Sequence, residues 1–483
     1  MAEHSKRRWA WTAGLLATAA AIGGVWLDRP ALAQIAVQNQ GYVPYSDAPI
    51  NYRTQALHDP VAELEKKLEQ GKARLVYDKD HGYLKSVLDL LKVPVESQTL
   101  VFSKTSFQYP KISPEHPRAL YYNDDVYVGS VHEGKAIEIV SFDAMQGAVF
   151  YLLDEQKADK PAFQRAELDC TQCHIARETR GVPGVFLRSV YPTTLGGLAA
   201  RTPSFVTDQK SPWKDRWGGW YVTGVDGEQT LANATAVKIA LNPEDKQVRP
   251  PLARLAQPYD ASAYLTPGSD PVALLVLAHQ TQMHNLITLT NYQTRLALYD
   301  LAKQATGGTP EEAAAVSKAA TPSIDDLPEA TRKQITTPAD QLLRYLLFSN
   351  ETPLGDLQAG KTLAASPYAK EFASHGPRDS QKRSLRDFDL NARIFRYPCS
   401  YLIYSSAFDA IPEPARDYIY HRLLQVLTGQ DQSPDFANLS AQDRQAILSI
   451  LLETKPGLPA EWRAWARSNH LRVAALPSRS AID

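Results

Sequence analysis

The chain is poor in sulfur-containing residues. Its 483 residues include only three cysteines and three methionines. Three cysteines argue against the dense disulfide framework that staples small secreted domains, and a zinc site built on thiolates would need more soft ligands. Two of the cysteines stand close together, and the third, Cys399, lies far away in a hydrophobic stretch.

The chain also lacks a charge bias and, after its first 33 residues, a long apolar run. The formal net charge is −1, and removal of residues 1–33 would take away four basic and two acidic residues, leaving about −3. This balance excludes a polybasic nucleic-acid-binding protein. No later run is long and uncharged enough to span a membrane. With no internal repeat, this length predicts two or three domains.

The most informative motif is Cys170-Thr171-Gln172-Cys173-His174. It reads C-x-x-C-H, the attachment sequence for c-type haem. The two thiols bond the vinyl groups at one edge of a porphyrin, and the adjoining histidine is an axial ligand of the iron. A redox dithiol, a zinc half-site and a disulfide also use C-x-x-C, but none of them needs the histidine. The motif predicts one covalent haem c.

The N-terminus has the pattern of an export signal. Lys6, Arg7 and Arg8 precede an apolar stretch over residues 9–27, and Ala31-Leu32-Ala33 fits a small-residue cleavage site. We expect a signal peptide over residues 1–33 and a periplasmic or other extracytoplasmic location. The alternative is an uncleaved N-terminal anchor. Export agrees with haem c, which is attached outside the cytoplasm.

The hydrophobic patterns predict an α+β fold that is mostly α. Strands are expected over residues 99–107, 119–130, 136–141 and 147–153, and helices over residues 60–70, 83–92, 271–303, 338–348 and 417–427, with a further helix capped by Ser440 and Asp443. We divide the chain into a signal peptide (1–33), an N-terminal arm with helices (34–97), a small antiparallel β region (98–160), a cytochrome-c-like haem core with wrapping loops and a long helix (161–305), a linker (306–330) and a helical C-terminal region (331–483).

The second axial ligand is sought on the long helix. Met283 and His279 are spaced i, i+4 and share a face, whereas His284 points about 100° away from Met283. Met283 is the first choice, because a thioether ligand suits electron transfer, and His279 and His284 are the alternatives. In each case the competing interpretation is an ordinary core or solvated residue.

Other residues are candidates for supporting roles. The carbonyl of Pro183 could accept a hydrogen bond from His174. Donors for the haem propionates are sought in the wrapping segment, namely Arg188, Arg201, Arg216, Trp217 and Trp220. Cys399 is interpreted as a buried thiol without a catalytic role.

These residues carry a resemblance to a known family. The motif Cys170, Cys173 and His174 and the export signal resemble those of bacterial periplasmic c-type cytochromes. Residues 102–106, 122–129 and 216–221 are similar to stretches in a group of large exported monohaem cytochrome c domain proteins. The resemblance covers much of residues 98–300 and 383–405, and it implies haem binding and electron transfer. A small cytochrome c domain needs only about 100 residues, so a comparison with the small cytochromes leaves most of this chain unexplained.

The expected function is electron transfer by a periplasmic monohaem cytochrome with a redox partner protein, rather than catalysis. Two alternatives are a peroxidase-like haem oxidoreductase with an open distal site and a haem-based binding or sensor protein. The carrier predicts a Met or His distal ligand, and the alternatives predict an open or displaceable position.

Overall fold

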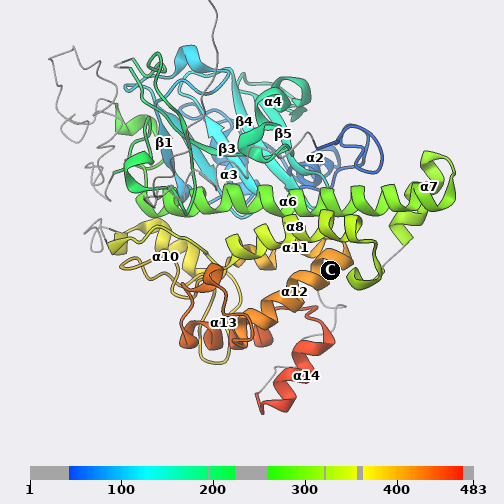
Figure 1. Ribbon diagram of the computed structural model, residues 1–483. Helices are drawn as coiled ribbons and strands as arrows, with labels where there is room; N and C mark the ends of the chain where they lie inside the picture. Colours follow the sequence, from blue (N-terminus) through cyan, green and yellow to red (C-terminus); the bar gives the residue numbers. More distant parts are fainter. Residues whose placement is uncertain (1–42, 194, 224–258, 320–321, 356–362, 472–483) are drawn as a thin grey trace, which may run out of the picture. The chain divides into compact units, whose positions relative to one another are not determined.

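The computed structural model describes residues 43–193, 195–223, 259–319, 322–355 and 363–471 (Figure 1). The predicted signal peptide, residues 1–33, and the first residues of the predicted arm lie outside these residues. The described part is an α+β structure with more helix than strand. A small antiparallel sheet comes first, and a helical C-terminal region follows, as the sequence predicts.

The main sheet is a meander of six antiparallel strands in sequence order, β1 to β6. Its strands are β1 (Thr99–Val101), β2 (Arg118–Tyr122), β3 (Val126–Ser130), β4 (Ala136–Asp143), β5 (Gly147–Asp154) and β6 (Gln164–Arg165). The first is shorter than predicted, because the chain leaves the sheet at Phe102, whose N–H donates to the carbonyl of Gly219 at 2.9 Å. The Asn123 side chain accepts from the N–H groups of Asp125 and Val126 and closes the predicted turn between β2 and β3.

The two faces of the sheet contribute to two different hydrophobic cores. Side chains alternate between the faces along a strand, so Tyr121, Val128, Ile139 and Val149 face one core, and Tyr122, Tyr127, Phe142 and Phe150 face the other. The first core also holds α2 (Pro60–Glu69) and α3 (Leu84–Leu90). Asp59 caps α2 by accepting from the N–H of Val61 at 3.0 Å, which confirms the predicted start of this helix.

The second core is centred on α6 (Pro271–Thr306), a helix of 36 residues. Asp270 caps its start, and Gly307 ends it in the left-handed conformation with φ of 56°. The helix is buried on nearly every side from Pro271 to Tyr292. In Figure 1 it runs between the strands above and the C-terminal helices below. Because α6 is packed on all sides, its polar side chains, such as Gln280 and Asn285, are buried as well and find hydrogen-bond partners inside the protein.

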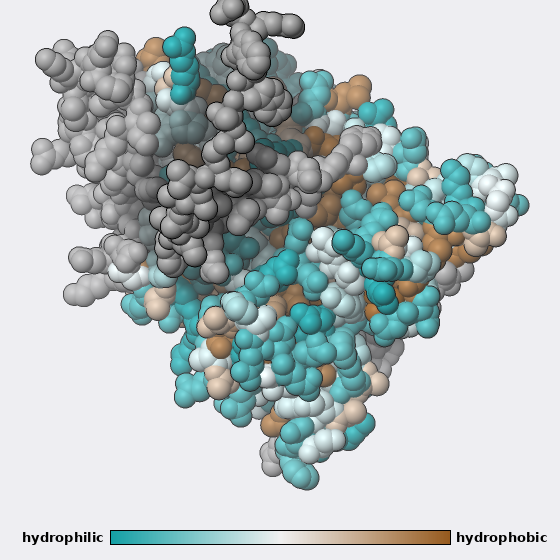
Figure 2. Space-filling view, in the orientation of Figure 1, coloured by the Kyte–Doolittle hydropathy of each residue, from teal (hydrophilic) through white to brown (hydrophobic). Residues whose placement is uncertain are grey.

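The C-terminal region consists of helices packed on α6 and on one another. They are α8 (Glu329–Leu346), α10 (Pro367–Ser374), α11 (Ser406–Asp409), α12 (Glu413–Leu427), α13 (Ala441–Thr454) and α14 (Ala460–Ser468). The predicted linker contains α7 (Pro310–Ala319). Ser440 and Asp443 form the predicted capping box of α13. Figure 2 shows mainly hydrophilic residues over this region on the visible face.

Two helices begin earlier than predicted, and one of them, α12, starts at Glu413 rather than at residue 417. Residue 338 was expected to start a helix, because proline lacks an N–H and favours the first turn. Instead α8 begins at Glu329 and carries Pro338 inside it. Ile335 and Ala339 flank this proline and are both fully buried, so packing on both sides holds the helix together across it.

Among the described residues, none of the helices combines the length and the apolar character needed to cross a membrane.

Candidate functional site

The C-x-x-C-H motif forms the end of a short helix, α4 (Glu167–His174). Cys170 is partly buried and Cys173 is exposed. Residues i and i+3 lie on the same side of a helix, and both cysteines line one cleft together with His174. The structure therefore brings the three predicted haem-attachment residues to a single site.

The cleft lies between α4, the sheet and α6. Its cavity volume is about 210 Å³. Most of its walls are apolar: among the lining residues are Leu120, Val140, Phe150, Leu152, Val185, Phe186, Leu187, Trp220 and Leu277. Ligand sites are typically concave, with mostly apolar walls and a few polar groups. A porphyrin ring is large, flat and apolar, so it is a type of ligand that such walls suit.

The imidazole of His174 is held in a defined orientation. Its Nδ1 lies 2.9 Å from the carbonyl oxygen of Gly184, and the Gly184 N–H donates back to the His174 carbonyl at 3.0 Å. The ring also packs against Phe150 and Phe186, with centroid distances of 5.0 and 6.1 Å. Burial lowers the pKa of His174, which favours the neutral ring that a metal requires. The Nδ1 contact leaves Nε2 as the ring nitrogen that a metal could use.

The carbonyl that contacts His174 belongs to Gly184, one residue after Pro183, whose carbonyl was predicted. The carbonyl of Pro183 accepts from the N–H of Ala148 at 3.2 Å and so is used by the edge of β5. Asn285 of α6 holds the following residue, Val185, from both sides: its Oδ1 accepts from the Val185 N–H at 3.2 Å, and its Nδ2 donates to the Val185 carbonyl at 2.8 Å. The long helix thus positions the loop that orients His174.

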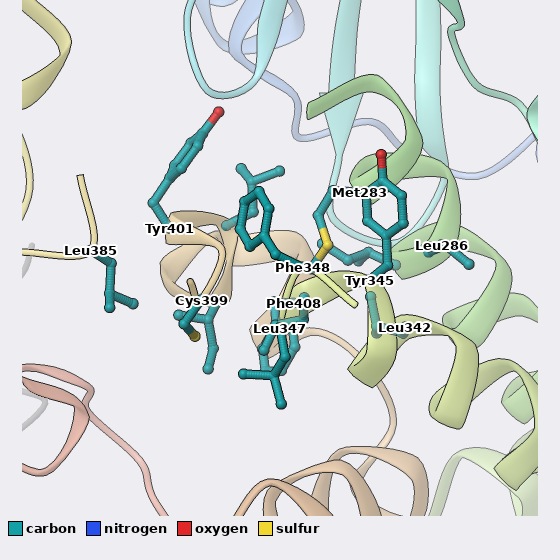
Figure 3. Close-up of a cluster of buried hydrophobic side chains, with 14 of the residues drawn as sticks. Met283, Leu286, Leu342, Tyr345, Leu347, Phe348, Leu385, Cys399, Tyr401 and Phe408 are labelled. Carbon is teal, nitrogen blue, oxygen red and sulfur yellow. The ribbon is translucent and has the colours of Figure 1, made fainter. Parts of the chain in front are cut away.

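Met283, the first choice for the distal ligand, lies outside the cleft. It is fully buried in the second core on the side of α6 that faces α8. Figure 3 shows its sulfur among Tyr345, Phe348 and neighbouring apolar side chains. Met283 is therefore placed as a core residue, which was the alternative to its interpretation as a haem ligand.

His279 shares that side of α6 and has both ring nitrogens occupied. Nδ1 lies 2.5 Å from Oε1 of Gln209, and Nε2 lies 2.8 Å from Oγ of Ser400. Its ring stacks on Phe348 at a centroid distance of 4.4 Å. Burial lowers its pKa to about 3, so this histidine is neutral.

His284 faces the turn between β2 and β3. Its Nε2 lies 2.7 Å from the carbonyl oxygen of Asp124, and its ring stacks on Phe142 at 3.9 Å. Nδ1 is buried and has no hydrogen-bond partner among the described residues. Burial lowers the pKa of His284 to about 4. Like the other two candidates, His284 is not among the residues that line the cleft.

The cleft therefore contains one histidine and no methionine among its described lining residues. Every histidine and methionine from residue 43 onward falls within the described residues. The face of α6 that reaches the cleft carries Leu277 and Thr281 instead. Within the described ranges there is also no group of three or more His, Cys, Asp or Glu side chains placed to hold a bare metal ion.

Of the predicted propionate donors, only Trp220 lines the cleft, and its Nε1 donates to the carbonyl of Arg188 at 2.8 Å. Arg216 is buried elsewhere, where it donates to the carbonyls of Ser211 and Gln209. Trp217 is buried, and its Nε1 has no partner among the described residues. Arg188 pairs with Glu178 at 3.8 Å, and Arg201 is exposed.

A charged pair that was not predicted from the sequence lines the cleft, namely Arg118 of β2 and Glu138 of β4. The two residues are 20 positions apart and belong to non-adjacent strands, so no local pattern relates them. Cys399 is fully buried, and burial raises the pKa of its thiol, in agreement with its interpretation as a core residue.

Comparisons with known proteins add nothing to this geometry. No protein-family model, no curated protein and no solved structure matches the chain.

Proposed function

We propose that this chain is an exported monohaem c-type cytochrome, with Cys170 and Cys173 as thioether anchors and His174 as an axial ligand. The observation that supports this proposal is that all three side chains line one largely apolar cleft, while the Nδ1 of His174 is held by the carbonyl of Gly184. A porphyrin suits the apolar walls, and an oriented neutral imidazole suits its iron.

The chain's own residues perform three tasks in this proposal. The Gly184 carbonyl fixes the tautomer of His174 and so directs Nε2 away from the loop. Phe150 and Phe186 pack against the ring and restrict its rotation. The apolar walls exclude water, which lowers the local dielectric and tunes a buried redox centre. A bound haem would supply one-electron redox chemistry.

Electron transfer to a partner protein and a periplasmic location belong to the same proposal. They rest on the export pattern of residues 1–33 and on the family resemblance of the haem motif. The exposed position of Cys173 puts this end of the cleft near the surface, where exchange with a partner is possible.

The test is expression of the full chain with its signal in bacteria that have a working haem-attachment system. A pyridine haemochrome assay and the intact mass should show one covalent haem per chain. Cys170→Ser and Cys173→Ser should each reduce covalent attachment, and the double variant should abolish it. Cys399→Ser is the matched control and should retain the haem. Exported protein without covalent haem would refute the proposal and return Cys170 and Cys173 to a dithiol role.

A second candidate function is binding of an external ligand at the iron, as in a sensor or an oxidoreductase. The specific observation in its favour is that Met283, His279 and His284 all lie outside the cleft. This candidate predicts a high-spin spectrum and ready binding of carbon monoxide to the reduced protein. A low-spin spectrum with no change under carbon monoxide would favour the electron carrier instead.

A further inference from the structure

The cleft has a polar end that the haem-attachment motif does not use. Thr105, Ser106, Arg118 and Glu138 line this end. Arg118 and Glu138 form an ion pair, and the Oε1 of Glu138 also accepts from the hydroxyl of Ser106 at 2.6 Å and from Nε2 of Gln108 at 2.9 Å. Charged groups in an otherwise apolar cleft are costly to bury without partners. The polar cluster around Arg118 and Glu138 therefore needs a specific explanation.

Gly129 makes the ion pair possible. In the sheet Gly129 is paired with Leu120 on one side and with Glu138 on the other. A Cβ atom at Gly129 would lie 2.8 Å from Nε and 2.9 Å from Cζ of Arg118. The guanidinium of Arg118 therefore lies over the backbone of Gly129 and crosses β3 to reach Glu138 on β4. Any larger residue at position 129 would displace it.

Arg118 has unused hydrogen-bonding capacity. A guanidinium carries five N–H donors in a fixed plane. Glu138 accepts at one terminal nitrogen, whereas the Nε of Arg118 is buried and has no partner among the described residues. Glu138 is shared with Ser106 and Gln108, so its own acceptor capacity is largely occupied. A buried donor without an acceptor is unfavourable, which indicates that an acceptor is supplied by a bound group.

The position of Arg118 identifies the chemistry of that group. α4 lies beside β5, where the Ala166 N–H donates to the Phe150 carbonyl at 2.9 Å. Neighbouring strands are about 4.8 Å apart, so the guanidinium over β3 is about 10 Å across the sheet from β5. A porphyrin carries its two carboxylates on the edge opposite its vinyl groups. A ring attached at Cys170 and Cys173 would thus present carboxylates toward the polar end of the cleft.

We propose that Arg118, positioned by Gly129 and Glu138, binds a propionate carboxylate of the haem. This inference rests on the proposed function and goes beyond it, since it assigns a cation and a positioning pair that lie outside the attachment motif. A planar guanidinium is well suited to a carboxylate, because two parallel N–H donors can meet its two oxygens.

The test uses the haem-loaded full chain and three measurements: haem per chain, the midpoint potential by spectroelectrochemistry, and the propionate bending bands in resonance Raman spectra. Arg118→Gln should shift the propionate bands and lower the midpoint potential, because a cation beside the haem favours the added electron. Arg118→Lys should keep the charge but still alter the bands. Arg188→Gln removes a cation near Phe186 that does not line the cleft, and it should leave the bands unchanged.

Two further variants keep the test decisive if Arg118→Gln does not fold. Glu138→Gln leaves Arg118 in place and should raise the midpoint potential. Gly129→Ala changes no charge but displaces the guanidinium, and it should shift the propionate bands as Arg118→Gln does. Unchanged bands and potential in the haem-loaded Arg118 and Gly129 variants would overturn this inference alone. Absence of covalent haem from the wild-type chain would instead refute the proposed function.

Discussion

Nδ1 of His174 lies 2.9 Å from the carbonyl oxygen of Gly184, and this contact joins the end of α4 to a loop that α6 holds in place. Asn285 holds the loop through the next residue, Val185. The orientation of the proposed axial imidazole thus depends on a residue more than one hundred positions later in the chain.

Replacement of Asn285 by leucine should therefore affect both stability and the haem. The N–H and C=O groups of Val185 would lose their partners, which costs about 1–3 kcal/mol for each unsatisfied group. We expect a lower free energy of unfolding in urea and a changed absorption spectrum of the haem-loaded protein. Asn438→Leu is the control, because Asn438 donates to the Leu347 carbonyl in the C-terminal region. It should lower stability and leave the spectrum as it is. Identical spectra for both variants would show that the loop does not orient His174.

Met283→Leu should leave the haem spectrum unchanged. Met283 is fully buried among apolar side chains away from the cleft, and a swap of similar volume usually costs less than about 1.5 kcal/mol. The measurement is the oxidised and reduced absorption spectrum together with thermal unfolding. His174→Ala serves as the positive control and should change the spectrum strongly. If Met283→Leu altered the low-spin bands, Met283 would be a ligand and the cleft would have to rearrange around the bound haem.

The two buried histidines of α6 should make stability fall in acid. Burial lowers the pKa of His284 from 6.5 to about 4 and that of His279 to about 3. Below pH 6.5 the unfolded chain takes up protons that the folded chain does not bind. Each histidine then lowers the free energy of unfolding by about 1.4 kcal/mol per pH unit. For His284 this loss continues down to about pH 4 and then stops.

Urea unfolding from pH 7 to pH 4 of the wild type and of His284→Leu would measure this effect. The pKa values of Asp125 and Glu351 are raised by burial to about 7, and these acids act in the opposite direction. The difference between the two proteins isolates His284. The variant should lose stability less steeply than the wild type between pH 6.5 and 4. Parallel curves for His284→Leu and the wild type would contradict the prediction.

The three cysteines should react differently with iodoacetamide in protein made without haem. Cys173 is exposed and Cys170 partly so, whereas Cys399 is fully buried and burial raises the pKa of its thiol. Because the thiolate is the reactive form, we expect mass spectrometry to find labels on Cys173 and Cys170 in the native protein and on Cys399 only in urea. Cys399→Ser should give the same native mass increase. Native labelling of Cys399 would mean that the second core opens readily.

Local signals predicted much of this fold. Asp59 before Pro60 marks the start of α2, and Ser440 with Asp443 marks the start of α13, because caps are made within a few residues. The β region could be predicted for the same reason, since Asn123 forms its turn with its own neighbours. Pro338 shows the limit: packing of Ile335 and Ala339 continues the helix where the local rule would begin it.

The candidate site also contains some residues that a local sequence signal predicts and others that only the fold brings together. Cys170, Cys173 and His174 are adjacent in sequence and carry their own signal. Met283 and His279 do share a buried face, as predicted, but α6 is buried on several faces, and periodicity does not say which neighbour covers which face. Arg118 was missed because its relation to Glu138 and Gly129 exists only once three strands have paired.

The long helix α6 also sets an order of events in time. The attachment motif ends at His174, but Leu277, Thr281 and Asn285, which complete the cleft and hold its loop, belong to a helix that starts about one hundred residues later. A chain made from its N-terminus presents both thiols well before these walls exist. If the chain is an exported cytochrome, as we propose, both cysteines would emerge outside the cytoplasm ahead of α6, and the later packing of α6 would complete the cleft around the cofactor.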